Sequence, residues 1–287
     1  MTARVSFQDR LRRLGLALAG VTVFALVGFG GSLLLLRFIR VAEPSPWSLA
    51  VNALSLGLSF GFATWLVGVR LAKRSWDQLG WHTTDGMTHR LVNGATLGAV
   101  MAALAIALAF LGSGARVQLT PDWSRWAAQA APLGCALILA ALWEELTFRG
   151  LPLRLLADAL GPVAAMLVLA IGFGIAHARN PHAGFLSTVN VALAAIWLSF
   201  AFFSPGGMAL AWGLHFGWNA GLALLFDAPV SGYTFQVPAV EYHPGTRVWV
   251  DGGAFGPEGG VVATIVLCTG TLAVIGSRFK QPKDWLA

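Results

Sequence analysis

Charged side chains are scarce in this sequence: Asp, Glu, Lys and Arg make up only 11% of its 287 residues, while hydrophobic residues make up 56%. With a mean hydropathy of +0.69, the chain is too apolar for an ordinary soluble domain. The sequence therefore predicts an integral membrane protein with the lipid bilayer as its surroundings. Its net charge of +6 arises from short Lys and Arg clusters between apolar runs, a pattern typical of cytoplasmic loops. No nucleic-acid partner is expected.

Cysteine is nearly absent as well. Cys135 and Cys268 lie far apart inside apolar segments, which excludes a disulfide framework and a thiolate zinc site. The chain also lacks a Pro/Gly/Ser linker, a low-complexity segment and a clear internal repeat. We therefore expect residues 1–287 to form a single polytopic membrane domain. The missing repeat weakens, without excluding, a secondary-transporter interpretation.

Apolar runs close to the ~20 residues that cross a bilayer recur along the chain. We expect eight of them, at 15–36, 47–69, 91–111, 132–155, 162–176, 185–203, 208–226 and 261–275. Backbone polar groups must be satisfied inside the hydrocarbon, and long apolar runs satisfy them as helices. The predicted fold is an all-α bundle of about eight transmembrane helices, whose fifth and eighth spans are the shortest.

The basic N-terminus precedes a run that is too long and too basic at its end for a cleaved signal peptide, so we expect a retained first span. Lys and Arg number 13 on the side that holds both termini and 6 on the other. This asymmetry predicts cytoplasmic termini. The high Ala, Gly, Arg and Trp content is compatible with a GC-rich bacterial genome, and the plasma (inner) membrane of a bacterium is the expected location.

The longest polar segment between apolar runs, residues 227–260, contains four prolines and a Gly-rich end. It should be irregular or carry short strands, and the charge count makes it a non-cytoplasmic loop. Two interpretations are open, a lid and a plain surface loop, and we favour the surface loop.

Glu144, Glu145 and Arg149 lie at the end of a run that carries no other charge between residues 126 and 143. An ionisable group at membrane depth costs a few kcal/mol or more, and it is usually kept for a function. In a helix Glu145 and Arg149 share one face, while Glu144 points about 100° away. Our hypothesis is that Glu144 takes part in the chemistry of a site and that Glu145 with Arg149 supports that site. The alternative is a purely structural triad at a helix end.

Two histidines and an asparagine are likewise polar residues at the end of, or within, later apolar runs. His177 ends the fifth run, and His215 and Asn219 stand four apart on one face of the seventh. Counting ~1.5 Å of helical rise per residue from the turn near residue 161 puts Glu144 and His177 about level, at about 25 and 24 Å. The same count, started from the turn at residues 204–207 on the same side of the membrane, gives about 13 Å for His215 and about 19 Å for Asn219. Helix tilt narrows the difference in depth between these two residues and Glu144. Alone, each histidine fits a packing role, but together the four residues are expected to converge in a buried pocket.

The sequence contains neither a Gly-x-Ser-x-Gly elbow nor a His-Glu-x-x-His motif. Without a nucleophile, the chemistry open to Glu and His is general-base activation of water, with His and Asn as donors to an oxyanion. The alternative function is a transport or binding protein in which the same Glu and His residues relay protons or bind a cation.

Three motifs in order, Glu144-Glu145-x-x-x-Arg149, Phe173-x-x-x-His177 and His215-x-x-x-Asn219, resemble those of the CAAX protease and bacteriocin-processing (CPBP) family of intramembrane endopeptidases. The resemblance covers residues 132–226, the expected CAAX protease-like catalytic core, with no departure at the motif positions.

This resemblance implies hydrolysis of a peptide bond in a peptide or prenylated-protein substrate. By analogy, Glu144 and His177 activate water, and His215 and Asn219 stabilise the oxyanion, without a cofactor. Members were first described as metalloproteases, so Zn²⁺ held by Glu144, His177 and His215 stays an alternative. The topology leaves one difficulty open, because it places the site nearer the non-cytoplasmic face, whereas prenyl-protein proteases act on cytoplasmic C-termini.

Overall fold

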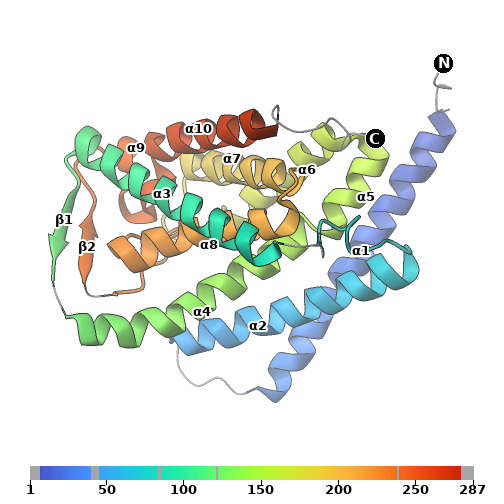
Figure 1. The fold of residues 1–287 in the computed structure, drawn as a ribbon, viewed down its shortest axis with the longest axis horizontal. Coiled ribbons are helices and arrows are strands. Elements are labelled where there is room, and N and C mark those ends of the chain that lie inside the picture. Colours follow the sequence, from blue (N-terminus) through green and yellow to red (C-terminus); the bar gives the residue numbers. More distant parts are fainter. Residues whose placement is uncertain (1–6, 40–44, 83–85, 121, 238, 279–287) are drawn as a thin grey trace.

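The computed structural model describes residues 7–39, 45–82, 86–120, 122–237 and 239–278, and most of these residues lie in helices (Figure 1). The α-helices are α1 (Phe7–Phe38), α2 (Pro46–Ala63), α3 (Met87–Ser113), α4 (Trp123–Phe148), α5 (Leu151–Leu160), α6 (Pro162–His177), α7 (Phe185–Phe202), α8 (Gly207–Ala220), α9 (Val248–Asp251) and α10 (Val261–Arg278). Two π-helical segments, η1 (Thr64–Leu71) and η2 (Gly221–Leu225), extend α2 and α8, and two 3₁₀ turns, η3 (Gly253–Phe255) and η4 (Pro257–Gly259), precede α10. The predicted all-α class is confirmed.

All eight predicted runs fall on helical segments. Within the described residues, five helices are long and apolar enough to cross a membrane: Gln8–Phe38, Pro46–Leu71, Met87–Ser113, Trp123–Leu160 and Phe185–Phe202. The runs predicted to be shortest form the shorter apolar helices Pro162–His177 and Val261–Gly276. The seventh run forms α8 and η2.

The fourth run was wrongly expected to be one helix from residue 132 to 155. It begins earlier, at Trp123, where Asp122 caps the first turn by accepting the backbone N–H of Arg125 at 3.0 Å. It also breaks at Arg149 and Gly150, and α5 then continues in another direction (Figure 1). The cause is Pro152, whose ring would clash with the carbonyl of Phe148 four residues earlier and which has no N–H to donate. The functional stretch thus ends a helix.

Helices α3 and α8 make the closest contact between long elements, because glycines on both face the partner's backbone. A methyl group on Gly217 would lie 2.0 Å from the carbonyl oxygen of Ala95, and one on Gly98 would lie 2.3 Å from that of Leu214. Small residues four apart allow such approach between membrane helices. The contact fixes α8, which carries His215 and Asn219, against α3.

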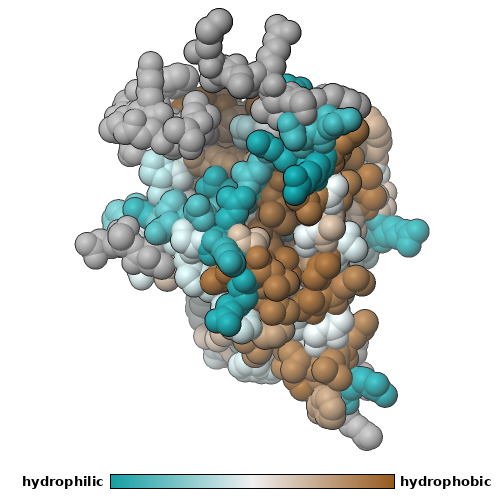
Figure 2. Space-filling view, turned by 90° about the vertical axis from the view of Figure 1, so that its right-hand side faces the viewer, coloured by the Kyte–Doolittle hydropathy of each residue, from teal (hydrophilic) through white to brown (hydrophobic). Residues whose placement is uncertain are grey.

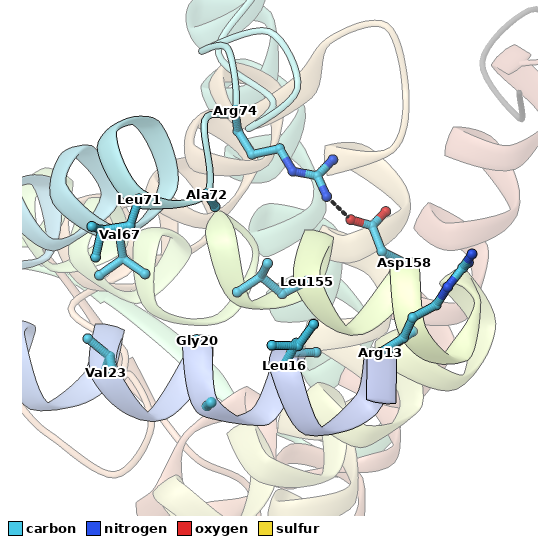
Figure 3. A pocket seen from close by; sticks show the side chains of 13 residues that line it. Arg13, Leu16, Gly20, Val23, Val67, Leu71, Ala72, Arg74, Leu155 and Asp158 are labelled. Atoms are coloured by element: carbon cyan, nitrogen blue, oxygen red, sulfur yellow. Dashed lines mark hydrogen bonds and ion pairs between the residues drawn. The ribbon is translucent and has the colours of Figure 1, made fainter. Parts of the chain in front are cut away.

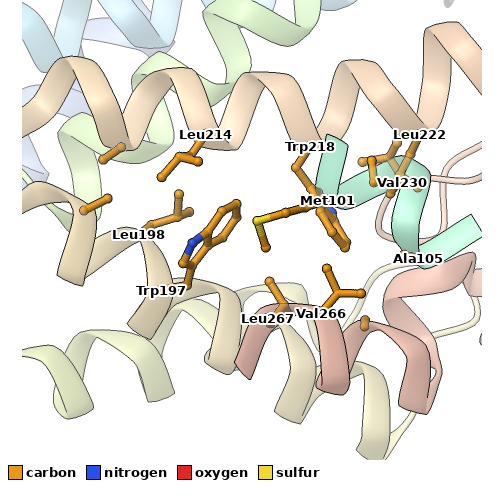
Figure 4. Close-up of a cluster of buried hydrophobic side chains, with 14 of the residues drawn as sticks. Met101, Ala105, Trp197, Leu198, Leu214, Trp218, Leu222, Val230, Val266 and Leu267 are labelled. Carbon is orange, nitrogen blue, oxygen red and sulfur yellow. The ribbon is translucent and has the colours of Figure 1, made fainter. Parts of the chain in front are cut away.

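The main hydrophobic core lies among α3, α7, α8 and α10 (Figure 4). Its largest members are Trp197 and Trp218, with ring centroids 6.4 Å apart. Because Trp218 lies one residue before Asn219, this packing also positions the polar face of α8.

Residues 227–260 carry one strand and short helical turns. Strand β2 (Val240–His243) pairs antiparallel with β1 (Arg116–Leu119), with Arg116 opposite His243. This two-stranded sheet lies at the end of the molecule opposite the N-terminal end of α1 (Figure 1). The expectation of short strands therefore agrees with the structure, and the described part of the segment also carries short helical turns.

Candidate active site

Glu145 is the fully buried centre of the polar cluster. Its Oε1 atom lies 3.2 Å from Nη1 of Arg149, one helical turn on, as the spacing predicts. The same oxygen lies 2.8 Å from Nδ1 of His215 on α8. Glu145 therefore joins α4 to α8 and pairs with His215 as well as with Arg149.

Glu144 points away from that pair and faces both histidines. Its Oε2 lies 3.9 Å from Nε2 of His177 and 3.7 Å from Nε2 of His215. These separations are too long for direct hydrogen bonds, and this buried oxygen has no hydrogen-bond partner within the described chain. Three polar atoms from α4, α6 and α8 thus surround one small space.

Each histidine ring is oriented by a bond at its other nitrogen. Nδ1 of His177 lies 2.8 Å from the carbonyl oxygen of Phe173, which can only accept, so Nδ1 carries the proton. Nδ1 of His215 likewise faces the Glu145 carboxylate. Both arrangements turn Nε2 toward Glu144, and neutral His177 offers a lone pair there.

Arg149 is held by charge and by ring contacts. Its side chain is 1% exposed, and its guanidinium carbon lies 4.6 Å from the centroid of the Phe173 ring. The Phe173 ring also packs on Phe148 and on the His177 ring, at centroid distances of 4.9 and 4.4 Å. One aromatic side chain therefore stacks between the supporting arginine and the His177 ring.

Asn219 and the two histidines line one cavity of about 370 Å³, together with Glu144. The structure thus brings all four predicted site residues to one cavity, with Glu145 and Arg149 behind it. The depth count that paired Glu144 with His177 assumed a straight helix up to residue 161. The break at Gly150 invalidates that path, although the two side chains still face each other.

Sequence reasoning missed Glu258, a second acid on the cavity wall. Its Oε1 accepts the indole N–H of Trp218 at 2.9 Å, and its Oε2 accepts both the backbone N–H of Ser231 and the Ser231 hydroxyl, the latter at 3.0 Å. The Ser231 carbonyl in turn accepts the Asn180 side-chain N–H at 3.0 Å, three residues after His177. The only signal in the sequence was an acidic residue in a Gly-rich turn.

The segment 228–237 therefore forms part of the cavity. Val230, Ser231, Tyr233 and Phe235 line it. This finding corrects the favoured interpretation of residues 227–260 as a plain surface loop, because Glu258 and Asn180 tie the segment to the helices of the site.

A second cavity of about 470 Å³ adjoins the first. It lies between α2 and α4, has mostly apolar walls, and shares lining residues with the first cavity, among them Trp143, Tyr233 and Phe235. An apolar group bound between α2 and α4 would lie directly beside the polar cluster.

The polar atoms around Glu144 lie farther apart than the ligand atoms of a zinc centre. Zinc with ligand bonds of about 2.0–2.2 Å brings its ligand atoms closer together than the 3.7 and 3.9 Å seen around Glu144. Within the described residues, no group of three or more His, Cys, Asp or Glu side chains has the arrangement of a metal site. We therefore assign no step to a metal, and the zinc alternative stays a prediction.

Comparison with known proteins gives one family match. Residues 125–221 match the family model described as Type II CAAX prenyl endopeptidase Rce1-like. A search of curated proteins found no match. The matched segment contains Glu144, His177, His215 and Asn219, and its bounds lie close to the core expected at 132–226. The predicted resemblance to the CAAX-protease-like (CPBP) family is confirmed over residues 125–221.

Proposed function

We propose that this protein is an intramembrane endopeptidase that hydrolyses a peptide bond of a membrane-associated substrate with water activated by Glu144 and His177. The observation that carries the proposal is the convergence of two histidine Nε2 atoms on Glu144 Oε2, at 3.7 and 3.9 Å, inside a cavity.

The convergence of these atoms supports water activation because the atoms that face the space between them mainly accept hydrogen bonds. The Glu144 carboxylate only accepts, and His177 presents a lone pair once Nδ1 donates to Phe173. A water molecule has two O–H donors, and separations beyond 3.5 Å suit a water bridge. Such a water would donate to Glu144 and His177 and turn its own lone pair outward, toward a substrate carbonyl.

The reaction then balances without a cofactor. The water oxygen forms a bond to the carbonyl carbon while Glu144 takes a proton, and the carbonyl oxygen becomes an oxyanion. When the C–N bond breaks, Glu144 returns that proton to the leaving nitrogen. The new carboxyl group loses the second proton of the water to the amine, so the products are a carboxylate and an ammonium group.

Asn219 and His215 are the proposed oxyanion donors. The Asn219 side chain offers N–H donors at the cavity wall, and His215 offers Nε2–H when it is protonated there. Glu145 holds the His215 ring at Nδ1, so we assign Glu145 and Arg149 a supporting role.

The substrate class follows from the family and from the second cavity. The matched family is named for prenylated CAAX proteins, and an apolar cavity beside the polar one suits a substrate that carries a lipid or an apolar segment. We further propose that the protein resides in a bacterial plasma membrane with cytoplasmic termini, supported by the distribution of its Lys and Arg residues.

A direct test uses purified protein in proteoliposomes. Quenched fluorescent peptides, each with and without a prenyl group, would be incubated with the protein and with its Glu144→Gln variant, and the products sequenced by mass spectrometry. We expect cleavage by the unmodified protein only. Proton or cation flux through the same proteoliposomes, with every peptide intact, would instead establish the transport alternative.

A further inference from the structure

A separate cavity of about 880 Å³ lies between α1, η1 and α5 (Figure 3). It shares no lining residue with the catalytic cavity. A packed cluster that includes Phe60, Leu146 and Leu151 lies beside it, around the end of α4. The two cavities are therefore distinct sites.

The walls of this cavity are apolar and partly open. Ala17 and Val67 line the cavity at buried positions and are 3% and 4% exposed, whereas Leu16 and Leu71 are each 64% exposed. Because α1 and η1 belong to segments long and apolar enough to cross a membrane, we expect these exposed leucines to face hydrocarbon and the opening to meet the bilayer. From Leu16 to Val23 the wall extends about 10 Å along α1, enough for part of an extended acyl chain.

One end of the cavity is charged. Arg13 comes from α1, Arg74 follows η1, and Asp158 on α5 forms an ion pair with Arg74 (Figure 3). Among the residues that line the cavity, two guanidinium groups stand against one carboxylate, a net charge of +1. The same end of the molecule shows hydrophilic residues beside a large apolar area (Figure 2).

Arginine binds phosphate well because its planar N–H donors match phosphate oxygens. Basic pockets between membrane helices accordingly bind anionic lipid headgroups. Neighbouring Arg70, whose guanidinium lies 5.6 Å from the Trp65 ring centroid, adds positive charge and an aromatic group of the kind found at membrane interfaces.

We propose that this cavity binds an anionic glycerophospholipid, with its phosphate at Arg13 and Arg74 and an acyl chain along α1. The volume falls within the range of small-molecule sites, about 300–1,000 Å³. The charge distribution favours this occupant over a purely apolar one, because a hydrocarbon chain alone gains nothing from two arginines. The inference does not depend on proteolysis at the other cavity.

Native mass spectrometry of the full-length protein tests the proposal. Protein in mild detergent would be titrated with phosphatidylglycerol and, separately, with phosphatidylcholine of the same acyl chains. We expect tighter binding of phosphatidylglycerol, reduced about fivefold by Arg13→Gln and again by Arg74→Gln, as a charge contact near the membrane surface predicts. Arg12→Gln is the matched control, since Arg12 is equally exposed but does not line the cavity.

A second pair of variants tests the chain-binding part. Ala19→Phe fills the cavity wall, whereas Leu18→Phe adds bulk at a neighbouring exposed position that does not line it. Ala19→Phe should lower the occupancy of phosphatidylglycerol and Leu18→Phe should not. Equal binding of the two lipids, or unchanged binding in the Arg13→Gln and Ala19→Phe proteins, would overturn the proposal. A dimer that Ala19→Phe dissociates would overturn it too, by assigning the surface to a second copy of the chain.

Discussion

Glu144 and Glu145 are neighbours in the sequence, but their side chains lie in different environments because a helix turns about 100° per residue. Glu145 is fully buried between Arg149 and His215, whereas Glu144 is 17% exposed and borders the cavity. Substitutions of the two should therefore fail for different reasons.

Glu144→Gln should abolish hydrolysis and leave folding nearly unchanged. The amide keeps the size of the side chain but cannot take a proton from water, and loss of a general base costs about 10²- to 10⁴-fold in rate. Turnover of a cleavable peptide and the melting temperature would be measured on the same preparation. An active, well-folded variant would remove Glu144 from the mechanism.

Glu145→Gln should lower stability as well as activity. Arg149 would lose its charge partner in a buried position, a defect of about 3 to 5 kcal/mol when a buried pair is broken. The amide oxygen can still accept a hydrogen bond from Nδ1 of His215. We therefore expect the melting temperature to fall while the orientation of the His215 ring changes little. If this variant proves stable but inactive, the roles of the two carboxylates are exchanged.

Metal dependence is decided by chelation. If Glu144 and His177 activate water directly, dialysis against a strong chelator should leave turnover unchanged. Activity that disappears and returns on addition of zinc would make Glu144, His177 and His215 ligands instead. A zinc-dependent protease treated in parallel controls for the chelation itself.

Residue spacing alone predicted part of this cluster. The four-residue offset of Glu145 and Arg149, and that of His215 and Asn219, follows from helical geometry. The bond between Glu145 and His215 joins residues 70 positions apart and depends on how α4 meets α8. No local pattern contains that information.

At the level of elements, the apolar runs identified the helices because a membrane span must be apolar throughout. They did not reveal where a helix breaks, as at Arg149 and Gly150, or that the glycines of α3 and α8 allow backbone contact. The role of segment 228–237 was also hidden, because it rests on the distant acid Glu258. The composition of a segment therefore predicts which secondary structure it forms, whereas the position of that segment in the fold depends on contacts between distant residues.

Glu258→Gln should loosen segment 228–237. The amide NH₂ would face either the Ser231 N–H or the Trp218 indole N–H, and in both cases a buried donor left without an acceptor costs about 1 to 3 kcal/mol. Hydrogen exchange of residues 228–237 should rise while that of α3 stays unchanged. Ser231→Ala, which removes only the hydroxyl bond, is the milder control. Unchanged exchange in Glu258→Gln would show that the acid does not anchor the segment.

At the scale of the whole molecule, segment 228–237 lines the candidate active-site cavity and belongs to the region that the charge count predicts to lie away from the cytoplasm. Orientation therefore bears on substrate access. With cytoplasmic termini, the segment would cover the cavity from the opposite side, and a cytoplasmic C-terminal substrate would have to enter through the bilayer, for instance by the apolar cavity between α2 and α4.

Cysteine labelling decides the orientation. Cys135 and Cys268 would first be replaced by alanine, and single cysteines placed at Thr88, exposed at the start of α3, and at Val248, which is 59% exposed on α9. With cytoplasmic termini, a membrane-impermeant maleimide should label Val248→Cys in intact cells, and Thr88→Cys only after permeabilisation. The opposite pattern would reverse the topology and place segment 228–237 on the cytoplasmic side, where a prenylated C-terminus could reach the cavity directly.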